Sequence, residues 1–414
     1  MLPQTQSQSQ TKLPTDPERA ERRARTYSAY ALVGVSMAHL LNDAMQTVIP
    51  AGFPLFREQL HLSFAEIGWV AFVLNVTASI LQPLIGYYTD KRPMPSLLPL
   101  GMMFSLAGMV GLAYSSSLAM LLLSVAAVGI GSSVLHPESS RVAHMAAGKG
   151  RGLAQSVFQV GGNTGQAFGP LLVALVLVPQ GQPGFLWFTL LAAAGLAIQV
   201  GVARWYKPRV TGARGQRGAA PSPQADAAMP GKKTIVFVLS VLILLLFSKF
   251  VYLAGMNGYY SFYYMDRFQR PLADAQVCLF VLQFAGMVGT LLGGPLADRI
   301  GRKNVIWFSI FGTAPFALLL PYAGPTLAML LCVPIGLILM SGFSVIIVYA
   351  QELLPGKVGT VAGLFFGLSF GMAGLGSVAL GWLADATTVS LVIRMSAFLP
   401  LLGIVAFWLP KDRR

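Results

Sequence analysis

The sequence predicts an all-α integral membrane protein with twelve transmembrane helices, arranged as two six-helix bundles related by a pseudo-twofold axis. The first observation is composition: apolar residues make up 55% of the 414 residues and charged residues only 11%, whereas about a quarter of a soluble domain is charged. The second is length, because twelve apolar runs each reach the roughly 20 residues that cross a bilayer. The third is an internal repeat that divides these runs six and six.

The twelve predicted helices set the domain boundaries. They lie near residues 28–56, 64–89, 95–113, 118–140, 150–178, 184–206, 234–264, 275–297, 303–321, 326–350, 359–384 and 389–409. The bundles therefore span residues 27–206 and 234–410. The polar segment 1–26 is expected to be a disordered tail, and 411–414 forms a short tail at the other end.

The basic residues predict the orientation, because cytoplasmic loops retain Lys and Arg. With both termini inside, that side holds most of the loop cations, including Arg19, Arg22, Arg23, Arg25, Lys91, Arg92, Lys149, Arg151, Arg299, Arg302, Lys303 and Lys357. The long loop 207–233 is rich in Gly, Ala, Pro and Gln, so we expect a flexible cytoplasmic linker. The basic residues fall between apolar runs and form no single basic face, which excludes a nucleic-acid partner despite the net charge of +14.

An internal duplication appears at a fixed offset. Four positions recur 208 residues later: Gly86, Asp90, Gly148 and Lys149 recur as Gly294, Asp298, Gly356 and Lys357. Two parallel six-helix halves with a site between them are typical of secondary transporters.

The repeated stretches "IGYYTDKRPMP" (85–95) and "GGPLADRIGRK" (293–303) each end an apolar run. Glycine lets two helices approach, aspartate can pair with a helix end or an arginine, and the cations hold the turn at the membrane surface. These properties predict a conformational latch formed by Gly86, Asp90, Gly294, Asp298, Arg299 and Arg302. A plain basic loop would explain the cations, but not the repeated Gly and Asp positions.

The fifth run contains "QSVFQVGGNTGQAFGP" (155–170). Gly161, Gly165 and Gly169, followed by Pro170, form a smooth ridge for helix packing, because residues four apart share a helix face. The amides on the nearly opposite face are expected to meet water or substrate; they are Gln155, Gln159 and Asn163. Close packing alone would leave these amides unexplained.

Charges deep in the membrane are costly, so the few present are candidates for function. "HLLND" places His39 and Asp43 on one face of the first helix, with Asn42 beside them, and Lys249 lies at similar depth on the seventh. A carboxyl desolvated at that depth can exchange a proton, which makes Asp43 the leading coupling residue, with Lys249 holding an anionic substrate. The alternative is a permanent Asp43–Lys249 ion pair that only orders the bundle.

The fourth helix ends with "HPESSR", which adds His136, Glu138 and Arg141. Glu138 is, with His39, a further candidate for proton coupling, although a Glu138–Arg141 salt bridge would explain both residues. Asn42, His136 and Arg141 are expected at the substrate site, where Arg141 joins Lys249 as a cation for an anionic substrate. On the seventh helix, Tyr252 and Asn257 are expected at the substrate site. The four tyrosines nearer the helix end, at 259, 260, 263 and 264, are expected in the interfacial aromatic belt.

Several long segments resemble the fosmidomycin-resistance exporters of the major facilitator superfamily. They are "HLLND", "LQPLIGYYTDK", "GSSVLHPESSRVAHMA", "AQSVFQVGGNTGQAFGPLL", "GGPLADRIGRKNVIW", "VYAQELLPG" and "GLFFGLSFGMAGLG", and the resemblance runs from about residue 36 to 410. It implies an antiporter of the bacterial inner membrane that expels fosmidomycin, a small phosphonate antibiotic, and other drugs. Apart from the resemblance, we expect a monomer. The proton gradient supplies the energy and no cofactor is needed.

Local electrostatics and the resemblance differ on the direction of coupling. An anion bound beside Asp43 would help it take up a proton, which favours cotransport, so antiport rests on the resemblance and requires conformational coupling. An importer or symporter of a small anionic metabolite is the alternative. An enzyme is not expected, because the sequence shows no metal-ligand cluster, nucleophile elbow or phosphate-binding loop.

Overall fold

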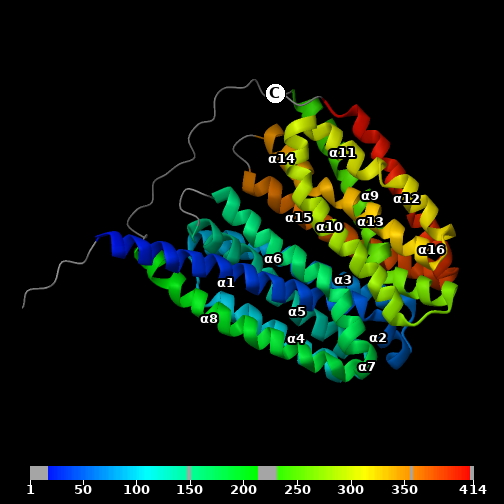
Figure 1. Cartoon of the computed structure of the whole chain (residues 1–414), viewed down its shortest axis with the longest axis horizontal. Coiled ribbons are helices and arrows are strands. Elements are labelled where there is room, and N and C mark those ends of the chain that lie inside the picture. Colours follow the sequence, from blue (N-terminus) through cyan, green and yellow to red (C-terminus); the bar gives the residue numbers. More distant parts are fainter. Residues whose placement is uncertain (1–16, 147–150, 213–230, 355–357, 411–414) are drawn as a thin grey trace, which may run out of the picture.

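The computed structural model describes residues 17–146, 151–212, 231–354 and 358–410, and within these ranges every regular element is a helix. Figure 1 shows the elements of the first half, from blue to green, grouped beside those of the second half, from yellow-green to red. The two-bundle architecture predicted from the repeat is therefore observed.

The first half begins with the long α1 (Pro17–Ala51), which ends just before Gly52. Ser63 and Glu66 form a reciprocal capping box that fixes the start of α3. The remaining elements follow in order: α2 (Phe53–Leu60), α3 (Phe64–Lys91), α4 (Leu97–Tyr114), α5 (Leu118–Ala146), α6 (Arg151–Leu172), η1 (Val173–Leu177), α7 (Val178–Gln180), η2 (Gln182–Trp187) and α8 (Phe188–Gly212).

The second half repeats this pattern, with its helices interrupted at other places. Gly342 separates the two helices of its fourth membrane crossing, and Gly301, at φ 92°, makes the turn after its second. Its elements are α9 (Lys232–Phe268), α10 (Leu272–Ile300), α11 (Arg302–Phe311), α12 (Ala314–Leu319), η4 (Leu320–Tyr322), α13 (Pro325–Ser341), α14 (Phe343–Leu353), α15 (Val358–Ala386), α16 (Val389–Ser396) and η5 (Leu399–Trp408).

The predicted boundaries of the N-terminal tail and of the linker are wrong, because helices extend into both segments. Residues 17–26 belong to α1, residues 207–212 continue α8, and α9 already starts at Lys232. Eleven segments of the described chain are helical and apolar enough to cross a membrane. The long α1 is not among them, and it carries His39, Asn42 and Asp43. Residues 1–16, 213–230 and 411–414 lie outside the described residues, as do Gly148, Lys149, Gly356 and Lys357 of the repeat.

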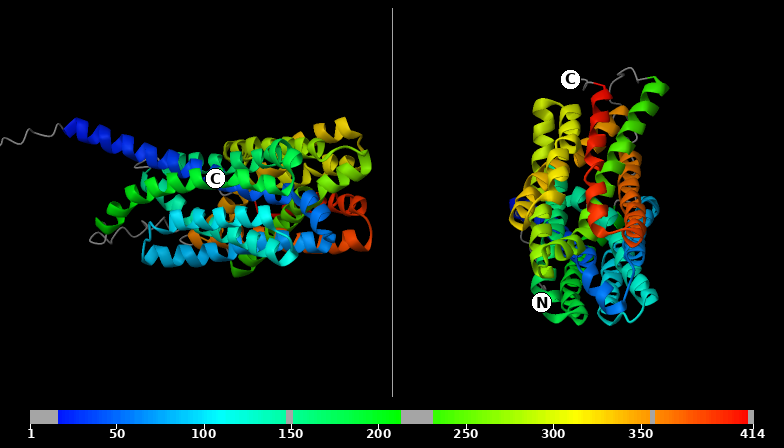
Figure 2. Two further views of the ribbon diagram at one scale, coloured as in Figure 1. Left: turned by 90° about the horizontal axis from the view of Figure 1, so that it is seen from below. Right: turned by 90° about the vertical axis from the view of Figure 1, so that its right-hand side faces the viewer.

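The helices run between two ends of the molecule. The linker end carries the end of α8, the start of α9 and the turn at Gly301; the far end carries α2, the start of α3 and the turn between α15 and α16. Figure 2 shows α1 and α8 extending past the other helices at the linker end.

The halves touch mainly along two pairs of helices, α3 with α15 and α6 with α10. At the far end the contact is close: a side-chain carbon added at Gly68 would lie 2.7 Å from the Ser377 carbonyl oxygen, and one at Gly381 would lie 2.4 Å from the Phe64 carbonyl oxygen. Nearer the linker end, a carbon added at Gly367 or Gly371 of α15 would meet nothing within 4 Å. The α15 surface that carries these two glycines therefore faces open space nearer the linker end.

Hydrogen bonds join the halves at the far end. The N–H groups of Phe64 and Ala65, in the first turn of α3, donate to the two carboxylate oxygens of Asp385 at the end of α15, both at 2.8 Å. The Gln276 amide of α10 donates to the Ala51 carbonyl at 2.9 Å. Asp385 thus caps a helix of the opposite half, where the α3 dipole favours a negative charge.

The glycine row of α6 packs against α1. A side-chain carbon added at Gly161 or Gly165 would lie 2.2 or 2.1 Å from the carbonyl oxygens of Ser36 and Leu40. One added at Gly169 would meet the Thr47 side chain at 2.6 Å, and Pro170 is buried. Only glycine permits this approach, which holds α6 beside the polar residues of α1.

The tyrosines of α9 are a correction to the expected aromatic belt. Tyr259, Tyr260, Tyr263 and Tyr264 are all buried inside the second half. Two of the hydroxyls donate to backbone carbonyls inside this half: Tyr259 to Ser377 at 2.6 Å and Tyr263 to Pro321 at 3.0 Å. These rings fill the core around α9 and do not lie at a lipid-facing surface.

Candidate functional site

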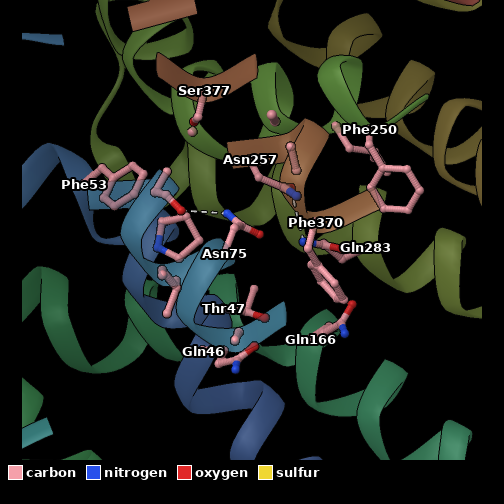
Figure 3. Close-up of a pocket in the computed structure, with 18 of the residues that line it drawn as sticks. Gln46, Thr47, Phe53, Asn75, Gln166, Phe250, Asn257, Gln283, Phe370 and Ser377 are labelled. Atoms are coloured by element: carbon pink, nitrogen blue, oxygen red, sulfur yellow. Dashed lines mark hydrogen bonds between the residues drawn. The ribbon is translucent and has the colours of Figure 1, made fainter. Parts of the chain in front are cut away.

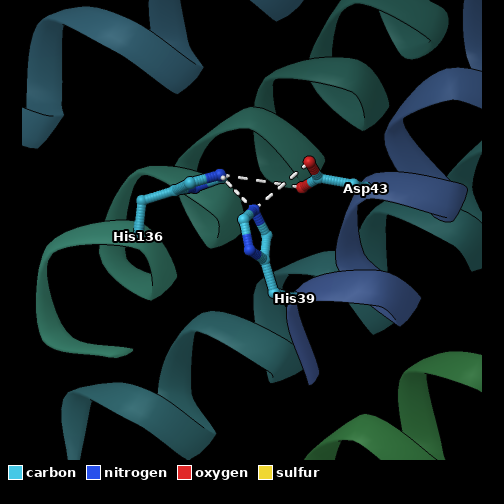
Figure 4. Close-up of side chains that lie close together, drawn as sticks. All are labelled: His39, Asp43 and His136. Carbon is cyan, nitrogen blue, oxygen red and sulfur yellow. Dashed lines mark hydrogen bonds and ion pairs between the residues drawn. The ribbon is translucent and has the colours of Figure 1, made fainter. Parts of the chain in front are cut away.

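Three ionisable side chains meet inside the first half, as Figure 4 shows. His39 and Asp43 lie one turn apart on α1, and His136 reaches them from α5. The Asp43 carboxylate oxygens lie 3.3 Å from His39 Nε2 and 3.6 Å from His136 Nε2, and the two Nε2 atoms are 3.2 Å apart. His39 and Asp43 are buried, while a quarter of the His136 side chain is exposed.

Backbone carbonyls orient both imidazole rings. His39 Nδ1 lies 2.9 Å from the Phe158 carbonyl oxygen, and His136 Nδ1 lies 2.9 Å from that of Ser132. A carbonyl can only accept a hydrogen bond, so both Nδ1 atoms carry hydrogen. The two Nε2 atoms, which face each other and Asp43, are left to bind or release a proton.

Neutral amides complete the shell around Asp43. Asn42 donates to Oδ1 at 3.0 Å and to the Ser132 hydroxyl at 3.1 Å. Gln166 of α6 donates through Nε2 to Oδ2 at 2.8 Å. Asn42 was predicted at the substrate site, but the structure buries it against Asp43.

The grouping of His39, Asp43 and His136 was not foreseen from the sequence as a place for a cation. Their candidate ligand atoms lie within 4.8 Å of one another, a spacing that one small cation can bridge. A proton fits this group without rearrangement, because the Nε2 atoms are already at hydrogen-bond distance. His136, expected to bind substrate, belongs to this group.

A central cavity of about 190 Å³ lies between the two halves. Its polar lining consists mainly of amides, and its apolar lining includes three phenylalanines, as Figure 3 shows. The amides are Gln46, Asn75, Gln166, Asn257 and Gln283, and the aromatic residues are Phe53, Phe250 and Phe370. None of the described lining residues is charged. Such a surface suits a small polar molecule that both donates and accepts hydrogen bonds.

Gln166 belongs both to the central cavity and to the shell around Asp43. Its side chain lines the cavity while its amide nitrogen contacts Asp43. In Figure 3 the amide oxygen of Gln166 is turned towards Phe370, and the nitrogen is turned away from it. The sequence contained a signal for this residue, because Gln166 lies seven positions after Gln159 and so continues the same helix face.

Of the residues predicted on the second half, Asn257 lines the cavity and accepts a hydrogen bond from Gln283 at 3.2 Å. Lys249 does not line it: its buried ammonium donates to the Leu339 carbonyl at 2.9 Å. No carboxylate of the described residues lies within 4 Å of Lys249, so the alternative Asp43–Lys249 ion pair is absent there. Tyr252 is buried in the core instead.

The predicted amide face of α6 does not line this cavity. Gln159 and Asn163 are half-buried and lie outside its lining, and the Gln155 side chain lies outside the described part of the structure. The same helix face reaches the cavity further along α6, at Gln166, which also contacts Asp43.

Glu138 and Arg141 form the salt bridge that was the alternative in the sequence analysis. Arg141 donates to Glu138 Oε1 at 3.1 Å and to the Thr89 carbonyl at 2.7 Å. Glu138 is fully buried and is not part of the His39–Asp43–His136 group. This network ties α5 to the end of α3, beside the first repeat of the latch.

The second latch repeat lies at the turn between α10 and α11. Arg302 pairs with Glu352 of α14, whereas Asp298 and Arg299 are exposed. The close helix contact is at Gly293, where an added carbon would lie 1.9 Å from the Ser341 carbonyl oxygen, and Gly294 meets nothing within 4 Å. In the first repeat Gly86 lies near Pro137, and the Asp90 side chain is outside the described part.

Comparison with known proteins identifies the family to which this architecture is similar. The profile of the Major Facilitator Superfamily matches residues 35–376. The Fosmidomycin resistance protein of Escherichia coli (strain K12) is 47% identical over 393 residues, which cover 94% of this chain and 95% of that protein. An uncharacterized MFS-type transporter of Bacillus subtilis (strain 168) is also 47% identical, over 92% of this chain and 93% of its own length.

Solved structures share the fold at low sequence identity. A bacterial homologue of the human lysosomal transporter Spinster, in an inward-facing and occupied conformation, has a TM-score of 0.74 at 16% identity, covering 92% of this chain and 96% of that one. The nucleoside transporter NupG has a TM-score of 0.66 at 14% identity, covering 91% and 97%.

Proposed function

The chain belongs to the Major Facilitator Superfamily, and from that premise we propose that it exports fosmidomycin and related drugs in exchange for protons. The identity to a Fosmidomycin resistance protein along almost the whole chain supports the substrate class. The observation that carries the coupling is the buried His39–Asp43–His136 group beside the central cavity. We place the protein in the bacterial inner membrane as a monomer, with the linker end cytoplasmic.

The geometry of the buried group favours one bound proton. With both Nδ1 atoms protonated, two neutral rings would bring the Nε2 lone pairs to 3.2 Å from each other and to 3.3 and 3.6 Å from a carboxylate. One proton shared there leaves an imidazolium, an imidazole and a carboxylate, with no net charge. Loss of that proton leaves a buried carboxylate uncompensated, which disfavours the packing of α1 against α5. Protonation therefore biases the conformation of the first half.

The cavity is the proposed substrate site. Fosmidomycin carries a phosphonate and an N-hydroxyamide, and amide side chains can donate to the first and accept from the second. Since none of the described lining residues is charged, the phosphonate is held by amide N–H groups. This replaces the expectation that Lys249 and Arg141 hold the anion.

Alternating access follows from the contacts between the halves. The far end is closed by Asp385 and Gln276, while open space lies beside Gly367 and Gly371 of α15 nearer the linker end. With the linker end cytoplasmic, this conformation receives a drug from inside the cell. Asp298 is exposed in it, and we propose that Asp298 forms its latch contact only when the linker end closes.

Proteoliposomes with labelled fosmidomycin test the proposal. In antiport the drug moves against the proton flow, so vesicles with an acidic lumen should accumulate it above protein-free vesicles. Vesicles with an alkaline lumen should not. Accumulation only with the alkaline lumen would establish proton symport and reject export by exchange.

A further inference from the structure

We propose that Gln166 couples the central cavity to the buried proton site, and that it does so through a hydrogen-bond donor of the substrate, such as a hydroxyl group. The proposal rests on the proposed function above and adds a residue and a chemical feature of the substrate. Its basis is position: Gln166 lines the cavity and also donates to Asp43 at 2.8 Å.

The amide has two ends, and the structure uses one of them for Asp43. Because an ionised carboxylate only accepts hydrogen bonds, Asp43 holds the Gln166 nitrogen. The amide oxygen is then the end available to the cavity, and Figure 3 shows it turned towards Phe370. Gln166 therefore offers the substrate an acceptor for as long as Asp43 is ionised.

The sign of the coupling follows from hydrogen-bond cooperativity. A substrate hydroxyl that donates to the amide oxygen polarises the amide, and this strengthens the N–H bond to the Asp43 carboxylate. Adding a proton to the group places an imidazolium beside the Asp43 carboxylate, which competes with the Gln166 N–H for that carboxylate and weakens the same chain of hydrogen bonds. Substrate binding and protonation thus oppose each other, as exchange requires, whereas an anion placed directly beside Asp43 would favour cotransport.

The groups around Asp43 are few. Within 4 Å, the ionisable groups of the described chain are His39 on α1 itself and His136 on α5. The neighbouring α6 contributes the neutral Gln166, and Asn42 completes the shell. Gln166 is the member of this shell that also lines the cavity.

Proton release on substrate binding provides the test. Fosmidomycin is added to the detergent-solubilised full chain in weak buffer with a pH-indicator dye, and its Kd is measured from pH 6 to 8. The native chain should release protons, and its Kd should weaken by up to about tenfold per pH unit as the pH falls. Gln166→Met, which keeps the side-chain length without the amide, should still bind fosmidomycin but release less than a fifth as many protons per bound drug.

The matched control is Gln283→Met. Gln283 lines the same cavity but bonds Asn257 rather than the buried group, so its variant should bind more weakly and keep the native proton release per bound drug. Gln166→Asn retains an amide too short to reach both partners, and it should behave like Gln166→Met. It gives an independent result if the methionine variant folds poorly, as judged by its Tm.

The outcomes distinguish a failure of the Gln166 role from a failure of the proposed proton exchange. Native proton release per bound drug in both Gln166 variants would overturn the role of Gln166 and leave exchange intact. A native chain that binds fosmidomycin without releasing protons would overturn the proposed exchange, and the role of Gln166 with it. Loss of release in the Gln283 control as well would show that any change in the lining breaks coupling, which also rejects a special role for Gln166.

Discussion

Replacing Asp385 with asparagine should open the far end. The carboxylate accepts from the N–H groups of Phe64 and Ala65, both at 2.8 Å, and so caps α3 from the opposite half. Loss of a cap costs about 1 kcal/mol, and a charge at a helix N-terminus contributes about 0.3–1 kcal/mol. Asparagine keeps one acceptor and the site is exposed, so we expect a net loss of about 1 kcal/mol. The open-to-closed ratio at the far end should then rise about fivefold.

Spin labels at the exposed positions Gln59 and Thr387 measure this opening. They lie on opposite halves at the far end, and double electron–electron resonance gives the distance distribution between them. Asp274→Asn is the control, because Asp274 lies at the same end but pairs with Arg270 of its own half at 3.9 Å. An unchanged distribution in Asp385→Asn, or an equal shift in the control, would refute the capping argument.

Four further predictions follow from the site and its packing. Asp43→Asn should still bind fosmidomycin but lose accumulation driven by a pH gradient, and retained pH-driven accumulation would remove Asp43 from the coupling. Gly165→Ala should lower the Tm, at a cost of about 1–3 kcal/mol, because the added carbon meets the Leu40 carbonyl, while Gly367→Ala should not lower it. Lys249→Met should change fosmidomycin affinity by less than about threefold and keep or raise the Tm, since it removes a buried charge outside the cavity; a loss above about tenfold would put Lys249 at the substrate. Dialysis against a chelator should leave transport unchanged, because a proton occupies the His39–Asp43–His136 group; loss restored by Zn²⁺ would show a metal there instead.

The sequence by itself determined the class of the molecule and its internal symmetry. Three features led to this: the lengths of the apolar runs, the distribution of Lys and Arg, and the repeat offset of 208 residues. They depend on the bilayer and on gene duplication rather than on contacts between helices, so they can be identified from the sequence alone. Helical spacing also paired His39 with Asp43, because residues four apart share a face. The glycine ridge of α6 was found by the same rule.

Only the tertiary structure decided which side chains meet across helices. His136 is separated from His39 by 97 residues, and their contact depends on how α5 packs on α1. Lys249 was misjudged and Gln166 was not singled out, because depth along a helix follows from the sequence, whereas packing decides what a side chain at that depth contacts. The glycine contacts with α1 turn Gln166 into the cavity, and Lys249 turns away to the Leu339 carbonyl. A rotation of one position moves a side chain by about 100° around the helix, which is enough to exchange a cavity residue for a buried one.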